Sequence, residues 1–222
     1  MSGEVAEIAL ITDSLGLPES TAPAALTSLA PWIARAKAGD LAAFEQLIEC
    51  YQRKVLTTAW RLLGDQEDAR DAAQEVFLRV FKYLRGFRSD QDFAAWLYRI
   101  IVNVCRDQAR KRGYRDQFTS FEAEQEIGSF AAMASTQDVE AAAIQSQQQA
   151  MIARALDTLS GKERAAIVMR DIEGLTTQEV ARVLGSSQST VRAQISSARA
   201  KIKVYRDRVL NRPGQEIRRG KT

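Results

Sequence analysis

Apolar side chains recur every three or four residues in the first half of the chain, which predicts three amphipathic helices. The first begins at Asp40, whose carboxylate can cap it, and runs to about Leu63 with an apolar stripe of Phe44, Leu47, Ile48, Tyr51, Val55, Ala59 and Leu62. The second begins at Asp65 and buries Ala69, Ala72, Val76, Phe77, Val80, Phe81 and Leu84. The third helix follows a loop from Gly86 to Asp92, and its inward-facing residues are Phe93, Trp96, Leu97, Ile100, Ile101 and Val104.

The periodicity is lost over residues 113–146 and returns in four shorter helices. These helices are predicted over residues 147–158, 161–172, 177–184 and 188 to about 206. The second of them follows a capping box of Ser160 and Glu163, and the third follows a capping box of Thr176 and Glu179. No strand-like alternation extends beyond a few residues. The pattern therefore predicts an all-α fold of two small helical domains joined by a flexible acidic linker.

The domain boundaries follow from the same pattern and from proline, which is absent between residues 32 and 212. We expect a flexible N-terminal extension over 1–34, a first helical domain over 35–112, the acidic linker over 113–146, a second helical domain over 147–206, and a basic tail over 207–222.

Composition removes many kinds of active site from the 222-residue chain, which contains no histidine. The two cysteines, Cys50 and Cys105, lie inside apolar helical patterns and are expected to be buried rather than reactive. No cofactor, small-molecule substrate or catalytic site is expected. The longest apolar stretches are too short to span a bilayer and no targeting segment is recognisable, so we expect no direct membrane insertion and a cytoplasmic protein.

Charge is distributed unevenly, although the net charge is only +3. Residues 1–31 and 116–149 carry acids and no base, while basic residues cluster around 106–115 and again over 192–221. Two basic zones on either side of an acidic linker indicate a polyanionic partner that is contacted twice. Simple solubilising charge is the alternative.

Residues 176–199 have the spacing of a helix-turn-helix, with internal contacts from Val180, Ala181, Leu184, Val191 and Ile195. Ser187 is the expected N-cap of the second helix, which leaves Gln188, Ser189, Arg192 and Gln194 available to a DNA groove, while Arg199, Lys201 and Lys203 would meet phosphates. A helical hairpin that binds no nucleic acid has the same pattern.

Two further surfaces of the first domain are candidates for binding. Aromatic and basic residues gather around the third helix, where they could stack unpaired bases: Phe87, Arg88, Trp96, Tyr98, Arg99 and Arg106. Trp96 fits the core better, whereas Tyr98 and the loop are expected to make contacts. The second helix carries an acidic face that is either solvated or docks on a basic helical partner: Asp68, Asp71, Gln74 and Glu75.

These segments resemble the extracytoplasmic-function group of sigma-70-type transcription initiation factors. The sequences GDLAAF at 39–44, DARDAAQEVF at 68–77 and FAAWLYRI at 93–100 are similar to its region 2. Residues 159–163, 173–176 and 179–199 are similar to its region 4. The resemblance covers about residues 37–112 and 147–205, in the order of the family.

The resemblance implies roles for the first domain. Its second helix would dock on the clamp helices of the largest subunit of core RNA polymerase through Asp68, Asp71, Gln74 and Glu75. Its loop and third helix would open the -10 promoter element and capture an extruded base through Arg88, Ser89, Asp90, Tyr98, Arg99, Asn103, Arg106 and Arg110.

For the second domain, the resemblance implies that the last helix reads the -35 element while its outer side meets the polymerase flap. The expected DNA-binding residues are Ser187, Gln188, Ser189, Thr190, Arg192, Gln194, Arg199 and Lys203. Gln194 and Ser197 stand where arginines are common, and Gln194 could pair with an adenine edge instead. An anti-sigma factor as regulator is a further implication.

Other functions stay open at this point. A stand-alone helix-turn-helix regulator would bind DNA without polymerase, and a helical adaptor would bind no DNA at all. An enzyme is the least expected class, because no segment groups paired acids, a nucleophile with a base, or a metal set.

Overall fold

The computed structural model describes residues 29–88, 92–111 and 150–210, and every regular element within these ranges is helical. The all-α prediction is therefore confirmed. The first domain contains α2 (Leu29–Lys37), α3 (Leu41–Leu63), α4 (Gln66–Tyr83), the short 3₁₀ helix η2 (Leu84–Gly86) and α5 (Phe93–Lys111). The second contains a helix over 150–157, α7 (Gly161–Ile167), the π-helical turn η3 (Val168–Ile172), α8 (Thr177–Leu184) and α9 (Gln188–Leu210).

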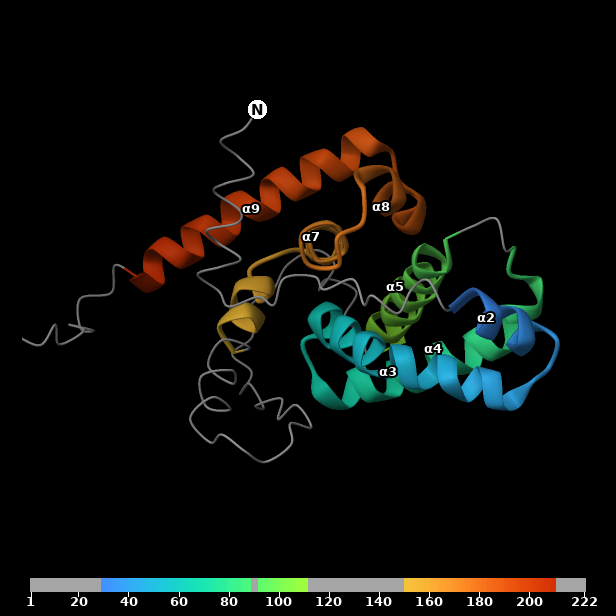
Figure 1. Cartoon of the computed structure of the whole chain (residues 1–222). Coiled ribbons are helices and arrows are strands. Elements are labelled where there is room, and N and C mark those ends of the chain that lie inside the picture. Colours follow the sequence, from blue (N-terminus) through green and yellow to red (C-terminus); the bar gives the residue numbers. More distant parts are fainter. Residues whose placement is uncertain (1–28, 89–91, 112–149, 211–222) are drawn as a thin grey trace, which may run out of the picture.

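The first domain is built around α3, against which α2, α4 and α5 pack (Figure 1). Its core comes from one stripe on each helix, and Val55, Ala59, Val76 and Ile101 are completely buried. Local capping sets the starts of two helices, since Asp40 accepts a hydrogen bond from the Ala43 amide (3.1 Å) and Asp65 accepts one from the Asp68 amide (2.8 Å). These starts agree with the prediction.

Helix α2 begins at Leu29, inside the segment that the sequence assigned to the N-terminal extension. Leu29 and Ile33 are buried against α3, so the first domain includes residues 29–34, which the sequence pattern places in the N-terminal extension. Pro31 lies in the first turn, where its missing N–H removes no helical hydrogen bond. The segment was missed because one helix of nine residues carries too few apolar positions to show a period.

Capping also starts the helices of the second domain. Both predicted capping boxes are present, Ser160 with Glu163 at the start of α7 and Thr176 with Glu179 at the start of α8. Where one helix was expected over 161–172, α7 ends at Ile167 and continues as η3. Helix α9 continues to Leu210, beyond the expected end near Arg206.

Two positions differ from the expected core. Cys105 is buried as predicted, but Cys50 is exposed, because α3 turns Leu47, Tyr51 and Val55 inward and leaves Cys50 beside that stripe. Phe81 is 55% exposed, since the buried stripe of α4 passes through Val76 and Val80. The prediction that these two side chains are buried was wrong.

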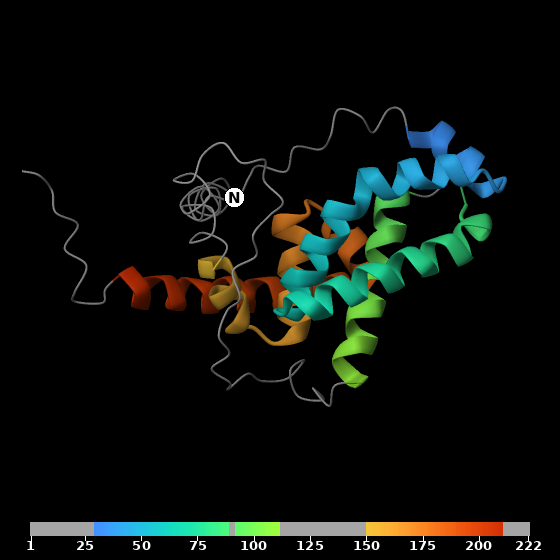
Figure 2. The same ribbon diagram turned by 90° about the horizontal axis from the view of Figure 1, so that it is seen from below.

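The two domains touch each other directly. Helix α8 packs against α5, and α7 and η3 approach α3, as Figure 1 and the turned view in Figure 2 both show. The linker predicted over 113–146 lies outside the described residues. None of the helices in the described ranges combines the length and the hydropathy that a transmembrane span requires.

Candidate nucleic-acid and polymerase interfaces

One side of α5 presents the basic and polar residues that the sequence assigned to the -10 element. Arg99, Asn103 and Arg110 are exposed and Arg106 is half-buried, at positions that repeat along one helical face. Arg88 is exposed at the end of α4 and η2, while Ser89 and Asp90 lie outside the described residues. The structure thus brings four of the expected residues onto one surface of α5.

Tyr98 is not on that surface, and the expectation that it is accessible for contact was wrong. Its side chain is buried, and its hydroxyl donates a hydrogen bond of 2.6 Å to Glu173 of the second domain. Burial raises the pKa of Tyr98, and the neighbouring Glu173 carboxylate raises it further, so the phenol stays protonated and donates. The sequence did not reveal this because the contact joins residues 75 positions apart.

The other aromatic residues of this region form core structure. Phe87 and Phe93 are buried, and Trp96 is half-buried against them with ring centroids 5.1 Å and 5.5 Å away. The interpretation of Trp96 as a core residue is therefore confirmed. These rings fix the start of α5 and thereby the direction of its polar face.

The acidic face of α4 is only partly as expected. Asp71 and Gln74 are exposed, and Glu75 is half-buried in an ion pair with Arg79 (2.7 Å). Asp68 is buried instead, where its backbone carbonyl and its carboxylate accept from the Gln108 amide at 3.1 and 3.4 Å. Asp68 therefore ties α4 to α5 and is not part of an outer docking face.

Exposed apolar side chains extend this face in a way that the sequence analysis missed. Leu78 is 65% exposed and Phe81 follows it along α4, with the Phe81 ring against Phe44 at a centroid distance of 5.1 Å. The apolar pattern places Phe81 in the buried stripe and assigns no role to Leu78, so only the three-dimensional packing shows both side chains as surface. Acidic, amide and apolar groups thus share the outer side of α4.

The helix-turn-helix of the second domain is present as α8 and α9. The turn has Gly185 in the left-handed region with φ of 63°, and Ser187 accepts a hydrogen bond from the Thr190 amide (3.1 Å) as the predicted N-cap. Val180, Ala181, Val191 and Ile195 are buried between the helices.

The first turns of α9 carry the exposed polar residues expected at a DNA groove: Ser187, Gln188, Ser189, Thr190 and Arg192. Arg192 donates to the Gln188 amide oxygen at 3.3 Å, so the two side chains lie side by side on one face. Lys203 is exposed further along the helix.

Gln194 and Arg199 do not have the surroundings that the sequence suggested. The Gln194 side-chain oxygen is buried and has no hydrogen-bond partner among the described residues, because the helical repeat places position 194 on the other side of α9 from Gln188 and Arg192. Arg199 forms a two-pronged ion pair with Asp171 at 2.9 and 3.0 Å. These predicted roles conflict with the arrangement in this structure.

Glu163 connects the start of α7 to α9. Its carboxylate accepts from the Ser160 cap (2.8 Å), from Ser197 (2.6 Å) and from Lys201 (2.8 Å), so Lys201 is also paired within the protein. Burial alone would raise the pKa of Glu163, but the hydrogen bonds from Lys201, Ser197 and Ser160 outweigh it and lower the pKa to about 2. Ser197, which stands where arginine is common in the family, thus has a role inside the domain as a donor to Glu163.

Glu173, which the sequence analysis did not single out, is the centre of the domain contact. Its side chain is 5% exposed and accepts hydrogen bonds from Thr58 (2.9 Å), Arg61 (3.0 Å) and Tyr98 (2.6 Å). Lys54 lies 3.9 Å away. All four neighbours belong to the first domain, on α3 and α5.

Comparison with known proteins places this two-domain arrangement in a family. The family model for Sigma-70 region 2 matches residues 47–115, and the model for Sigma-70 region 4 matches residues 149–202. The RNA polymerase sigma-H factor of Pseudomonas aeruginosa is 32% identical over 173 residues, which cover 77% of this chain and 89% of the relative. The ECF RNA polymerase sigma factor SigE of Mycolicibacterium smegmatis is 31% identical, covering 90% of this chain and 75% of the relative.

Solved structures agree with these relatives. The structure of CnrH in complex with the cytosolic domain of CnrY is 28% identical, with a TM-score of 0.59 over 81% of this chain and 97% of that one. The sigma factor RpoE from Bartonella quintana, solved with the anti-sigma factor NepR, shares the fold at 23% identity and a TM-score of 0.58, over 76% of this chain and 98% of that one. Region models in the family order, relatives matched over most of their length and a shared fold lead to one assignment. The chain belongs to the extracytoplasmic-function group of the sigma-70 family of RNA polymerase sigma factors.

Proposed function

We propose that this chain directs core RNA polymerase to promoters by reading the -10 element with region 2 and the -35 element with region 4, without catalysis of its own. The observation that carries this proposal is the pair of exposed polar helix faces, one on α5 and one on the first turns of α9, in two domains that match the two regions. In this proposal the first domain runs from α2 to residue 112, and the second domain spans residues 147–206.

The -10 surface in this proposal is the outer side of α5 with Arg88 and the loop through Ser89 and Asp90. Arg99, Asn103, Arg106 and Arg110 supply positive charge and amide groups on one face, which suits a separated DNA strand and its phosphates. An unpaired base costs a few kcal/mol to extrude, and contacts to the flanking backbone offset that cost.

The -35 surface is the beginning of α9. Gln188 and Arg192 lie together and can present donors and acceptors to base edges in the major groove, with Ser187, Ser189, Thr190 and Lys203 toward the backbone. In this proposal Arg199 contacts DNA only after leaving Asp171, and Gln194 only after a change of side-chain position.

The polymerase surface is the outer side of α4. Asp71, Gln74 and Glu75 provide negative charge and amide groups, while Leu78 and Phe81 provide an exposed apolar area beside them. Such a mixture is typical of a protein interface with an apolar centre and a polar rim. We propose that it docks on the clamp helices of the largest subunit, with Asp68 supporting the face from within.

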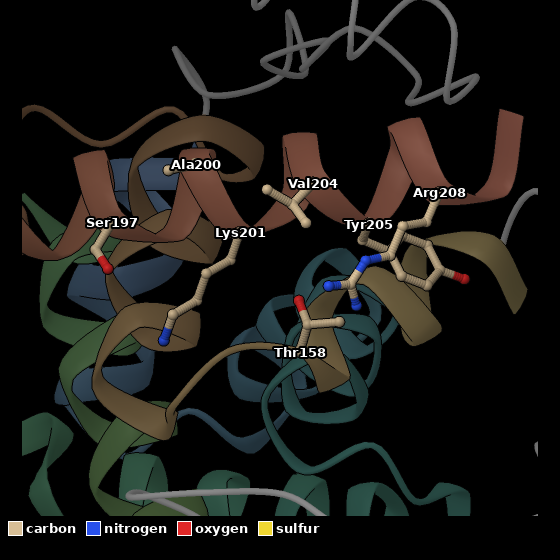
Figure 3. Close-up of a pocket in the computed structure, with 7 residues that line it drawn as sticks. All are labelled: Thr158, Ser197, Ala200, Lys201, Val204, Tyr205 and Arg208. Carbon is tan, nitrogen blue, oxygen red and sulfur yellow. The ribbon is translucent and has the colours of Figure 1, made fainter. Parts of the chain in front are cut away.

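Region 4 has a second surface suited to a protein rather than to DNA. A groove of about 440 Å³ lies along α9 and is lined by Thr158, Ser197, Ala200, Lys201, Val204, Tyr205 and Arg208 (Figure 3). At 3.6 residues per turn, these positions of α9 lie nearly opposite Gln188, Arg192 and Lys203. We propose that the polymerase flap occupies this groove while the other side of α9 faces the promoter.

Two of the solved relatives are bound to other proteins, the cytosolic domain of CnrY in one and the anti-sigma factor NepR in the other. We propose that this chain is likewise held by an anti-sigma factor and released to polymerase. Its place of action is then the cytoplasm, where core polymerase and promoter DNA are found.

Transcription with purified components tests the main proposal. The full chain mixed with core polymerase should produce transcripts that depend on a promoter, and Arg99→Ala should lower open-complex formation while core association is retained. DNA footprints that form without polymerase would favour a stand-alone regulator instead.

The polymerase face is tested separately. Phe81→Asp should weaken core association about tenfold, because a charge replaces an exposed apolar contact near the centre of the interface. Val209→Asp is the matched control, since Val209 is also exposed and apolar but lies at the end of α9. Unchanged core association in Phe81→Asp would remove α4 from the interface.

A further inference from the structure

Three hydrogen-bond donors and one further cation of region 2 surround one carboxylate of region 4. Thr58 and Arg61 on α3 reach one oxygen of Glu173, and Tyr98 on α5 reaches the other at 2.6 Å. Lys54 stands beside them and lies over the Tyr98 ring, 5.5 Å from its centroid. Region 2 therefore carries a preformed site for a two-oxygen anion, which a residue of the other domain fills in this structure.

This contact cannot persist in the promoter-bound state of the proposed function. Elements centred at -35 and -10 lie roughly 25 base pairs apart, or about 85 Å along the duplex at 3.4 Å per base pair. In this structure α8, which leads directly into the start of α9, packs against α5, so the -35 surface lies only about two or three helix diameters of 10–12 Å from the -10 surface. Regions that read both elements at once must separate, and Glu173 must leave its neighbours.

Separation leaves the donors of region 2 without their anion. Arg61 carries a permanent charge, Lys54 adds a second, and the hydroxyls of Thr58 and Tyr98 have been satisfied by Glu173. A phosphodiester resembles a carboxylate here, because it also offers two oxygens that share one negative charge. Tyr98 precedes Arg99 on α5, so such a phosphate would lie next to the -10 surface.

We propose that Lys54, Thr58, Arg61 and Tyr98 form a phosphate-binding pocket of region 2, which Glu173 occupies while the domains are closed and the promoter backbone occupies once they separate. This inference rests on the proposed function, because only a chain that reads two distant elements has to release Glu173. The same carboxylate is then an internal competitor of DNA, and the closed arrangement is an autoinhibited one.

Two substitutions with opposite effects test the proposal in the full-length chain. Glu173→Gln should open the free chain and leave the affinity of the holoenzyme for promoter DNA unchanged. Arg61→Gln should open the free chain as well, but weaken promoter binding by the holoenzyme about five- to tenfold and reduce its salt slope by about one. Tyr98→Phe, which removes only a hydroxyl, should act like Arg61→Gln with a smaller effect.

Opening is measured by energy transfer between dyes on the exposed Cys50 and on Ala193→Cys at the surface of α9, while Cys105 stays buried and unlabelled. Arg53→Gln and Glu49→Gln, both exposed on α3, are the matched controls and should change neither opening nor DNA binding.

Each outcome supports or overturns the proposal. Unchanged energy transfer in Glu173→Gln would show that Glu173 does not hold the domains together. Unchanged promoter affinity and salt slope in Arg61→Gln would show that the site takes no phosphate. Failure of the unmodified chain to form a promoter-specific holoenzyme would instead contradict the proposed function itself, and the energy-transfer measurement would still report on the Glu173 contact.

Discussion

Single charged residues hold the second domain together, and Glu163 is the clearest case. Its carboxylate caps α7 through Ser160 and binds Ser197 and Lys201 of α9. The cap follows a local sequence pattern, whereas the contacts to α9 join residues more than thirty positions away. A carboxylate with several donors is stabilising only while it is ionised.

Glu163 should make the stability of region 4 depend on pH in the acid range. The pKa of Glu163 is about 2 in the folded protein, against a reference value of 4.5. The ionised carboxylate therefore contributes its full stabilisation of the fold above pH 4.5, and this stabilisation is lost as the pH falls toward 2. We expect Glu163→Gln to lower the free energy of unfolding by about 2 kcal/mol at pH 7, after allowance for the partly exposed Lys201.

Urea unfolding of both proteins at pH 7, 5 and 3 measures this difference. The difference in the free energy of unfolding between the unmodified chain and Glu163→Gln should become smaller at pH 3. A difference of the same size at all three pH values would contradict a stabilising role of the ionised Glu163 carboxylate. Glu49→Gln, on the surface of α3, should show little difference at any of them.

At the scale of elements, the turn between α8 and α9 sets the angle at which the recognition helix is presented. Gly185 has φ of 63° there, in the left-handed region that side chains with a Cβ disfavour. A Cβ at this position would meet no atom within 4 Å, so the cost of a substitution comes from the backbone alone.

Gly185→Ala should therefore destabilise region 4 by about 1 kcal/mol. Gly86→Ala is a suitable control, because Gly86 has no positive φ and its Cβ would also meet open space. Thermal or urea unfolding of the two variants gives the comparison, and equal stability of the two would argue against a backbone cost at Gly185.

The first turn of α9 should determine -35 sequence preference. Gln188→Ala should change the ranking of -35 sequences by about 1–3 kcal/mol at the base pair that Gln188 contacts, because a side-chain amide reads base edges. Binding of the holoenzyme to a panel of promoters measures this, with the exposed Gln52→Ala as control. A uniform loss across the panel would indicate a backbone contact only.

At the scale of the whole molecule, the two domains share buried polar contacts as well as apolar packing. Arg164 is 5% exposed, pairs with Asp157 at 2.7 Å and donates to the Leu156 carbonyl at 3.0 Å. It also reaches the Leu62 carbonyl of the first domain at 3.5 Å. Burial lowers the pKa of Arg164, and Asp157 opposes that effect.

Arg164→Met should destabilise the protein by about 3 kcal/mol, because the packing volume is kept while Asp157 and two carbonyls lose a buried donor. Chemical denaturation measures the loss of stability. Far-UV dichroism follows the unfolding of both domains, and tryptophan fluorescence follows the first domain, because Trp32, Trp60 and Trp96 all lie there. A variant as stable as the unmodified chain would show that the buried guanidinium contributes little.

Helix starts were predictable from the sequence because capping is local. Asp40, Asp65, Ser160, Thr176 and Ser187 each bond to an amide within three residues, so the relevant partners are visible in the order of residues. The all-α class and the helix-turn-helix followed from the same local signals and from the apolar period.

The errors occurred where burial depends on a partner far along the chain. Phe81 and Cys50 lie beside their apolar stripes, and only the angle at which α3 and α4 meet their neighbours decides that they are exposed. Asp68 and Arg199 are charged residues of the kind usually found at the surface. In the fold, however, Asp68 is bound by Gln108 and Arg199 is paired with Asp171.

Helix starts, the succession of two helical units and the family could all be inferred from the order of residues, because those properties depend on neighbours within a few positions. The burial of Tyr98 and the contact of Glu173 with the first domain became visible only in the folded chain. Such a contact needs donors from α3 and α5 to meet a turn more than seventy positions later, and no local pattern specifies that approach.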